Sequence, residues 1–289
     1  MGIAVSRIGL IAREDRPDAP EVLRELVRWL RRRGCQVVVD PETGALVSDG
    51  ARVVERASLA GEVELIVVLG GDGTLLSAAR LVGGRGVPIL GVNLGHLGFL
   101  TATTIEALYP TLEPVLRGEY AAEERMMLGA LLSRDGNVRA EYLALNDIVV
   151  AKGGQGRLID LEVSADGQLM TAYRADGLII ATPTGSTAYN LSASGPILFP
   201  TMDAVVLTPI CSHALTNRPI VLPATVQLDV ALLADSPDVV LWLDGQPALP
   251  LTAKDVLQVR RAAARIRLVR DPQKTYFQVL RTKLKWGER

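Results

Sequence analysis

Cysteine and histidine are both scarce in this 289-residue sequence, which holds two of each. Two cysteines, Cys35 and Cys211, are too few for a disulfide framework or a cysteine-based zinc site. Two histidines, His96 and His213, exclude a metal site built from several histidines, and each alone is typical of a core or turn residue. Because so little cysteine suits a reducing compartment, we expect a cytoplasmic protein.

Aromatic residues and an excess of positive charge are lacking as well. Three Phe, three Trp and six Tyr offer few faces on which nucleic-acid bases could stack. The 31 Lys and Arg against 32 Asp and Glu give a formal net charge of −1, so no positive field attracts nucleic acid or an anionic membrane. No stretch reaches the roughly 18 apolar residues that a membrane-spanning helix needs. We therefore expect neither nucleic acid nor a membrane as a partner.

The composition, 48% hydrophobic and 22% charged, is that of a globular protein with a sizeable core. Over the first 100 residues, apolar strand patterns alternate with helix patterns. Strands are predicted at residues 7–12, 35–39, 65–69 and 87–92, and helices at 21–33 and 75–82. This alternation predicts a parallel sheet with crossover helices, whose functional loops lie at the carboxyl ends of the strands.

After about residue 120, short strands follow one another and Asp-Gly turn signals separate them. The predicted strands are 127–132, 141–150, 158–163, 169–173, 221–228 and 239–243. A helix over 105–117, interrupted by two prolines, connects the two regions, and the tail 275–286 is basic and amphipathic. The sequence therefore predicts a second, mostly-β domain.

The sequence Gly70-Gly71-Asp72-Gly73-Thr74 follows an apolar strand and opens a helix. Adjacent glycines let backbone N–H groups approach phosphate oxygens, and a helix N-terminus adds a favourable partial charge. An aspartate there repels phosphate, so it indicates a general base for an attacking hydroxyl or a ligand of Mg²⁺. The alternative is a tight turn in which Asp72 only caps the helix. Neither a Walker A loop nor a G-x-G-x-x-G fingerprint is present.

Two further polar clusters interrupt the apolar strands of the second domain. Asn146 and Asp147 offer a donor and acceptors that suit a ribose diol or an adenine edge, although a bulge or strand end also explains them. Segment 182–192 follows the apolar strand 178–181 and is dense in Ser and Thr. Small hydroxyl side chains beside glycine suit a close-fitting polar pocket, and the alternative is a surface loop.

Together these motifs resemble those of the ATP-dependent NAD kinase family over nearly the whole chain. The matches are the Gly70–Thr74 loop, 93–100, Asn146-Asp147 and 174–196, with weaker matches at 208–219 and 244–246. The glycine loop is shared with diacylglycerol and sphingosine kinases and with phosphofructokinases. Segment 182–192 is more particular to NAD kinases.

The resemblance implies a fold and an activity. It implies an α/β, Rossmann-like N-terminal domain, residues 1–120 joined by the tail 268–289, and a mostly-β, β-sandwich-like domain, residues 121–267, with the active site between them. The implied reaction transfers a phosphoryl group from Mg²⁺-ATP to the adenosine 2′-hydroxyl of NAD, giving NADP and ADP, and some relatives accept inorganic polyphosphate as donor. Family members are homodimers or homotetramers.

The resemblance also assigns roles to residues. Asp72 would be the general base, and backbone amides of Gly70, Gly71, Gly73 and Thr74 would bind phosphate. Because the loop has no lysine, Mg²⁺ would carry much of the charge neutralisation. The residues expected to bind the dinucleotide are Asp72, Gly73, Asn146, Asp147, Arg157, Arg174, Asp176, Thr184, Thr187, Ala188, Tyr189, Asn190, Leu191, Ser192 and Gln246. Of these, Asn146, Asp147 and 187–192 would hold the adenosine portion, and Asp176 would lie near the nicotinamide amide.

Some positions depart from the family pattern. Many relatives carry Glu where Asp147 stands, some carry a basic residue where Ser77 stands, and His96 falls at a variable position. Arg174 occurs in NAD-preferring members, so the resemblance predicts a preference for NAD over NADH. Because a cation beside the cationic oxidised ring is unfavourable, we expect Arg174 to act indirectly, by pairing with an acid such as Asp176.

Two other functions stay open. A lipid kinase of the diacylglycerol or sphingosine type shares the glycine loop, but it needs an apolar acyl pocket, which the hydroxyl-rich segment 182–192 does not suit. A non-catalytic NADP(H) sensor would bind the dinucleotide without turnover, and Asp72 argues against it.

Overall fold

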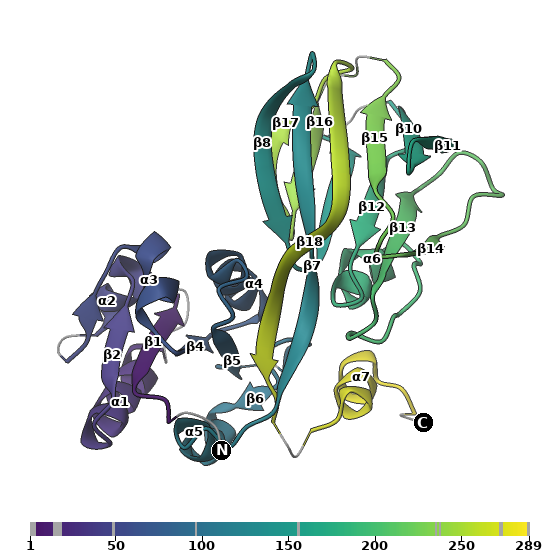
Figure 1. The fold of residues 1–289 in the computed structure, drawn as a ribbon. Coiled ribbons are helices and arrows are strands. Elements are labelled where there is room, and N and C mark those ends of the chain that lie inside the picture. The colour runs from purple at the N-terminus through teal and green to yellow at the C-terminus, as the bar shows by residue number, and fades with distance from the viewer. Residues whose placement is uncertain are drawn as a thin grey trace. The chain divides into compact units, whose positions relative to one another are not determined.

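The computed structural model describes residues 4–13, 19–47, 50–95, 97–154, 157–234, 236, 238–271 and 274–287. The chain divides into two compact units, unit 1 formed by Met1–Glu124 with Ile266–Arg289 and unit 2 formed by Arg125–Arg265. Each unit has its own hydrophobic core, and Figure 1 labels the elements. Among the described residues, no helix is both long and apolar enough to cross a membrane.

Unit 1 is built on a parallel sheet. Its strands are β1 (Arg7–Ala12), β2 (Gln36–Val39), β3 (Arg52–Val53), β4 (Leu65–Leu69), β5 (Pro88–Asn93) and β6 (Thr103–Thr104). The order is β5-β4-β1-β2-β3, with every neighbouring pair parallel, and β6 pairs with β5. The last residues of β18 (Asp255–Val269) also pair with β5. The helices are α1 (Ala19–Arg32), α2 (Pro41–Leu46), α3 (Arg56–Glu62), α4 (Asp72–Val82), α5 (Ile105–Leu116) and α7 (Tyr276–Leu284).

The local sequence explains these elements. In α1 the residues Leu23, Leu26 and Leu30 recur at helical spacing and are fully buried, and Gly34 ends the segment with φ of 78°. All five residues of β4 are buried, as expected for a parallel strand covered on both faces. Strands of this kind end in loops at one edge of the sheet, which is where the glycine loop lies.

Three helices of unit 1 differ from the sequence-based expectation. The helix predicted over 75–82 begins at Asp72, because the Gly71 carbonyl already accepts the N–H groups of Thr74 and Leu75. Neither α2 nor α3 was predicted. The start of α2 has a readable signal, since Asp40 accepts the Thr43 N–H as N-cap and a proline follows at the first helical position.

Unit 2 consists of two sheets. The six-stranded antiparallel sheet has the order β14-β13-β12-β9-β16-β17, and the other joins β11-β10-β15-β18 with β7 and β8. The strands are β7 (Ala122–Arg134), β8 (Asn137–Ala144), β9 (Asp147–Lys152), β10 (Ile159–Ala165), β11 (Gln168–Ala175), β12 (Gly177–Ala181), β13 (Ala204–Ile210), β14 (Ile220–Pro223), β15 (Leu228–Leu232), β16 (Val239–Leu243) and β17 (Gln246–Pro250). Leu161 and Val230 of one sheet share a core with Val150 and Leu241 of the other. This sandwich, with the α/β unit 1, confirms the predicted fold class.

Two predicted strands of unit 2 are each interrupted or cut short by a turn, and the strand predicted over 127–132 is longer, since β7 covers Ala122–Arg134. The strand predicted over 141–150 is two strands, β8 and β9, because the N–H groups of Leu145 and Asn146 bond to the Asp244 carboxylate instead of a neighbouring strand. The strand predicted over 221–228 ends at Pro223, whose carbonyl accepts the Val226 N–H in a turn before β15 begins.

Candidate functional site

The glycine loop lies at the carboxyl end of β4 and leads into α4. Its Gly70 N–H donates to the Val92 carbonyl at 2.9 Å, and the Thr74 N–H donates to the Gly71 carbonyl at 3.1 Å. Gly71 and Gly73 are exposed, and a Cβ at either would meet open space. Two of the four amides expected to bind phosphate therefore have partners within the loop region. Gly71 and Gly73 present an approachable backbone at the first turn of a helix.

Asp72 does not cap α4. The N-cap is Gly71, and no side chain caps this helix end. Instead the half-buried Asp72 carboxylate accepts four hydrogen bonds from residues 99–101. Oδ2 accepts the Phe99 N–H at 2.9 Å, and Oδ1 accepts the Leu100 N–H at 3.1 Å and the Thr101 N–H and hydroxyl at 3.0 Å each. The capping alternative is thus wrong, and the carboxylate has one fixed orientation.

The segment that holds Asp72 is itself fixed by the end of β5. Asn93 is buried, its Nδ2 donates to the Thr101 hydroxyl at 3.2 Å, and its Oδ1 accepts the Gly95 N–H at 2.6 Å. A side chain at Gly98 would overlap the Asp72 carboxylate and the Thr101 hydroxyl. The family-like stretch 93–100 therefore positions Asp72. His96, within it, lies outside the described residues.

A second pair of carboxylates gathers in unit 2. Asp244 begins the turn between β16 and β17, where its Oδ1 accepts the N–H groups of Asn146 at 2.7 Å and Asp147 at 3.3 Å, and its Oδ2 accepts that of Leu145 at 3.2 Å. Asp147 is 3% exposed. Burial, with repulsion from Asp244 as the smaller cause, raises the pKa of Asp147 to about 7. Asp147 therefore exchanges its proton near neutral pH.

Segment 182–192 is not a surface loop. Thr182, Thr184 and Ser186 are buried, and the segment continues into a 3-10 turn (Gly185–Thr187) and the short α6 (Tyr189–Ser192). The Thr182 hydroxyl donates to the Leu145 carbonyl at 2.6 Å, and a Cβ at Gly185 would overlap the Asn146 backbone. The two polar clusters singled out from the sequence therefore lie against each other.

Asn190 uses its side chain to hold this segment together. It is fully buried, and its Nδ2 donates to the carbonyls of Ser186 at 2.9 Å and Pro196 at 3.0 Å. Its Oδ1 accepts the Thr208 hydroxyl at 2.6 Å. Both amide hydrogens are thereby used within the protein.

A cavity of about 460 Å³ opens beside these residues in unit 2. Its lining contains four residues expected from the resemblance, Asn146, Asp147, Ala188 and Tyr189. The lining also contains Val149, Ala151, Lys152, Trp242, Asp244 and Gly245. Strand alternation puts residues 147, 149 and 151 on one face of β9, and Trp242 pairs with Val149 across to β16. That alternation was readable from the sequence, but the pairing with β16 was not.

The other residues expected to bind the dinucleotide do not line this cavity. Asp176 pairs with Lys152, whose Nζ lies 2.7 Å from its Oδ1. Arg174 is exposed and pairs with an acid as expected, but the acid is Asp160, with Nε 4.0 Å from Oδ1, and not Asp176, which was given as the example. The register of β10 against β11 explains this, because it sets Asp160 opposite Arg174. The remaining expected residues of unit 2 outside the lining are Arg157, Thr184, Thr187, Asn190, Leu191, Ser192 and Gln246. Asp72 and Gly73 belong to unit 1.

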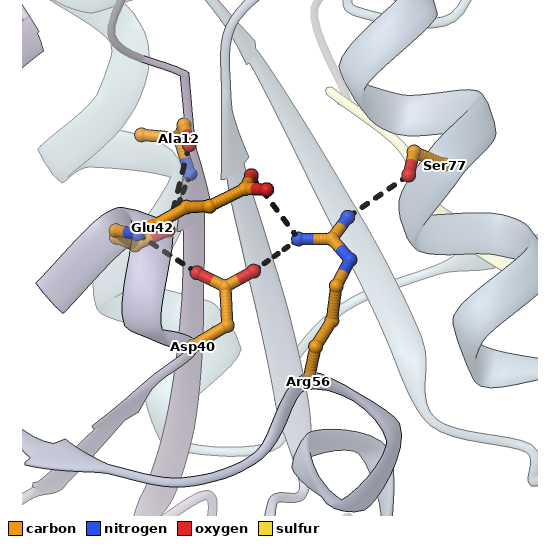
Figure 2. Close-up of polar contacts among 6 residues, drawn as sticks. Ala12, Asp40, Glu42, Arg56 and Ser77 are labelled. Atoms are coloured by element: carbon orange, nitrogen blue, oxygen red, sulfur yellow. Dashed lines mark hydrogen bonds and ion pairs between the residues drawn. The ribbon is translucent and has the colours of Figure 1, made fainter.

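Ser77 of α4 stands where some relatives carry a basic residue, and it accepts a hydrogen bond from an arginine of another helix. Nη2 of Arg56 donates to the Ser77 hydroxyl at 2.9 Å, and Nη1 pairs with the buried Asp40 (Figure 2). Glu42 lies 4.0 Å from Nη1. These contacts link α2, α3 and α4. Because two carboxylates offset the charge of the guanidinium, the cluster does not present an unopposed positive charge.

Comparisons with known proteins match both the N-terminal and the C-terminal part of the chain to the same family. The ATP-NAD kinase N-terminal domain model matches residues 8–120, and the ATP-NAD kinase C-terminal domain model matches residues 145–271. The NAD kinase of Syntrophotalea carbinolica is 50% identical over 285 residues, 99% of this chain and 100% of that protein. The NAD kinase of Geotalea daltonii is 48% identical with the same coverage.

Solved structures have the same fold. Yeast NADH kinase complexed with NADH superimposes with a TM-score of 0.93 at 27% identity, covering 99% of this chain and 89% of the yeast chain. An NAD kinase from Archaeoglobus fulgidus in complex with ATP has a TM-score of 0.75 at 23% identity, covering 96% of this chain and 98% of that one. The chain therefore belongs to the ATP-NAD kinase family.

Proposed function

We propose that this protein is an NAD kinase, which transfers the γ-phosphoryl group of Mg²⁺-ATP to the adenosine 2′-hydroxyl of NAD and gives NADP and ADP. Membership of the ATP-NAD kinase family supports this reaction. The observation that carries it is the environment of Asp72. This residue lies within the glycine loop and does not cap α4, and four hydrogen bonds orient its carboxylate.

Asp72 is the proposed general base. Its Oδ1 accepts three hydrogen bonds from Leu100 and Thr101, whereas its Oδ2 accepts one, from Phe99. Oδ2 therefore has the greater remaining capacity to accept a proton. As the 2′-oxygen of NAD bonds to the γ-phosphorus, its proton passes to Oδ2, and the bond from that phosphorus to the bridging oxygen of ADP breaks. Such transfers depend mainly on positioning and charge neutralisation.

Phosphate binding would use the backbone of the loop. The N–H groups of Gly71 and Gly73 are proposed as donors, since those of Gly70 and Thr74 already have partners. Mg²⁺ would be carried with ATP, bound by phosphate oxygens and water, and no side chain is assigned to it, because the Asp72 Oδ2 is the proposed base and its Oδ1 already accepts three hydrogen bonds. When bound, the ion would neutralise charge on the ATP phosphates. Among the described residues, no three acidic, histidine or cysteine side chains gather to hold a metal.

NAD would bind through the cavity of unit 2. Asp147, with its pKa near 7, accepts a hydrogen bond from a ribose hydroxyl when ionised and donates one when protonated. Ala188 and Tyr189 offer contact to a flat ring, and the buried hydroxyls and Asn190 hold the turn that carries them. Arg157, Arg174, Asp176 and Gln246 would contact parts of the dinucleotide beyond the cavity.

We also propose a homodimer or homotetramer in the cytoplasm. β14 is an edge strand of the six-stranded sheet, and its Ile220 and Val221 are exposed. An apolar edge strand suits pairing with a second copy of the chain. Cys211 is an exposed free thiol, which a reducing compartment preserves.

The test is product formation by the purified chain with Mg²⁺-ATP and NAD, measured with an NADP-specific dehydrogenase. We expect one NADP per ADP, and no product from an NAD analogue that lacks the 2′-hydroxyl. Parallel reactions replace ATP by inorganic polyphosphate, or NAD by sphingosine or diacylglycerol. A phosphorylated lipid without NADP would identify a lipid kinase, and dinucleotide binding without any product would identify a sensor.

A further inference from the structure

One wall of the unit 2 cavity is apolar and aromatic. Val149 and Ala151 face it from β9, and Trp242 faces it from β16. Trp242 is partly buried and packs against the buried cluster that contains Val149. An indole that lines a cavity beside small apolar side chains offers a flat surface on which a ring can stack.

The charged groups of the lining are mostly negative. Asp147 and Asp244 carry the two carboxyl groups. Lys152, the one cation among the described residues that line the cavity, has its ammonium 2.7 Å from the Asp176 carboxylate, which offsets its charge. A ring that enters this cavity therefore meets a negative environment at its edges and the electron-rich face of an indole.

We propose that Trp242 is a specificity-determining residue that stacks on the oxidised nicotinamide ring and favours it over the reduced ring. This inference rests on the proposed function. Oxidised nicotinamide is a cation, whereas dihydronicotinamide is neutral. A cation over an indole face gains an attraction that a neutral ring does not, and the negative charges of Asp244 and of ionised Asp147 act in the same direction. The proposal places nicotinamide where the resemblance implies the adenosine portion, and adenine, which is neutral, would not gain this attraction.

This assignment changes the expected cause of a preference for NAD. Arg174 was expected to set it by pairing with Asp176, but that acid pairs with Lys152. Arg174 itself is exposed and outside the cavity lining. Trp242 instead lies in the lining with both carboxylates.

The experiment compares kcat/KM for NAD and NADH in the wild type, Trp242→Leu, Trp242→Phe and Arg174→Gly. Trp286→Leu, at an exposed position of unit 1, is the matched control. We expect the wild type to prefer NAD, and the NAD to NADH ratio to fall about 2- to 30-fold in Trp242→Leu, the range of a cation–π contact. Trp242→Phe should fall in between, and the control should keep the wild-type ratio. An unchanged ratio in Trp242→Leu, or a loss confined to Arg174→Gly, would overturn the proposal.

A binding measurement separates this proposal from the proposed function, because it needs no turnover. In a chain with Trp29 and Trp286 changed to Phe, Trp242 is the one remaining tryptophan. Oxidised nicotinamide mononucleotide should quench its fluorescence and bind more tightly than either the reduced form or AMP. Quenching by AMP but not by the nicotinamide nucleotide would assign the cavity to adenine and overturn the proposal, even in an active kinase.

Discussion

Three aspartates of the candidate site differ in what surrounds their carboxylates. Asp72 is held by donors from one loop and keeps Oδ2 accessible to a proton. Asp244 accepts three backbone N–H groups and thereby ends β8 and starts β9. Asp147 is buried beside it and has a raised pKa. Residue type alone therefore does not distinguish the proposed base, an acceptor of backbone hydrogen bonds and a group whose raised pKa lies near neutrality.

The raised pKa of Asp147 predicts a pH-dependent stability. Between its ordinary value of 3.8 and its folded value of about 7, the folded chain holds a proton that the unfolded chain has released. The wild type therefore loses stability as pH rises through this window and levels off above it. Asp147→Asn lacks this loss, so its free energy of unfolding relative to wild type should rise by up to about 4 kcal/mol from pH 4 to 8.

Urea unfolding of both proteins at several pH values measures this difference. Gly61→Ala, which adds no ionisable group and whose Cβ meets nothing within 4 Å, is the control and should differ from wild type by a constant amount across the pH 4 to 8 range. A difference between Asp147→Asn and wild type that stays constant across the range would contradict the raised pKa.

At the scale of elements, the sequence pattern predicted the bounds of strands that no distant side chain interrupts. The strands predicted at 7–12, 65–69 and 239–243 are confirmed at those bounds as β1, β4 and β16. The sequence pattern gave wrong bounds where a side chain far along the chain bonds to the backbone of the predicted strand. The strand predicted over 141–150 is divided because a carboxylate almost 100 residues away takes its N–H groups. α2 and α3 are only six and seven residues long, too short for a clear helical period.

The loop 98–101 is the element that fixes the proposed base, and Gly98 tests it. A methyl group at position 98 would overlap the Asp72 carboxylate and force it to move. Gly98→Ala should therefore lower kcat by about 10²-fold, within the range of general-base catalysis, while the carboxylate is still present. The Kd for NAD should change little.

Gly61→Ala is the matched control, because a Cβ there meets nothing within 4 Å and the position lies in α3. It should be as active as wild type and stable to within about 1 kcal/mol. Full activity in Gly98→Ala would show that the position of Asp72 is not set by this loop.

At the scale of the whole molecule, the fold class followed from the change of pattern near residue 120, and family membership followed from a few motifs. The lining of the cavity did not follow, because it depends on register. Lys152, Trp242 and Asp244 enter it through the pairing of β9 with β16, strands about 90 residues apart in the chain. The motif at 244–246 predicts a turn, but no local pattern indicates that its aspartate accepts hydrogen bonds from the backbone of residues 145–147.

The chain also returns to its first unit in a way that local patterns do not reveal. β18 pairs with β15 in unit 2 through Val256–Val259 and with β5 in unit 1 through Arg267 and Leu268. The final helix α7 belongs to unit 1, and a capping box of Thr275 and Gln278 defines its start.

The central claim is that this chain phosphorylates the 2′-hydroxyl of NAD with Asp72 as the base. The most direct measurement compares wild type with Asp72→Asn, following NADP formation from saturating Mg²⁺-ATP and NAD and, separately, the Kd for NAD. We expect NADP formation by the wild type, a fall in kcat of about 10²–10⁴-fold in Asp72→Asn, and an NAD affinity that changes little. A variant that keeps more than about a tenth of the wild-type kcat would contradict the role of Asp72, since general-base catalysis is worth more than that.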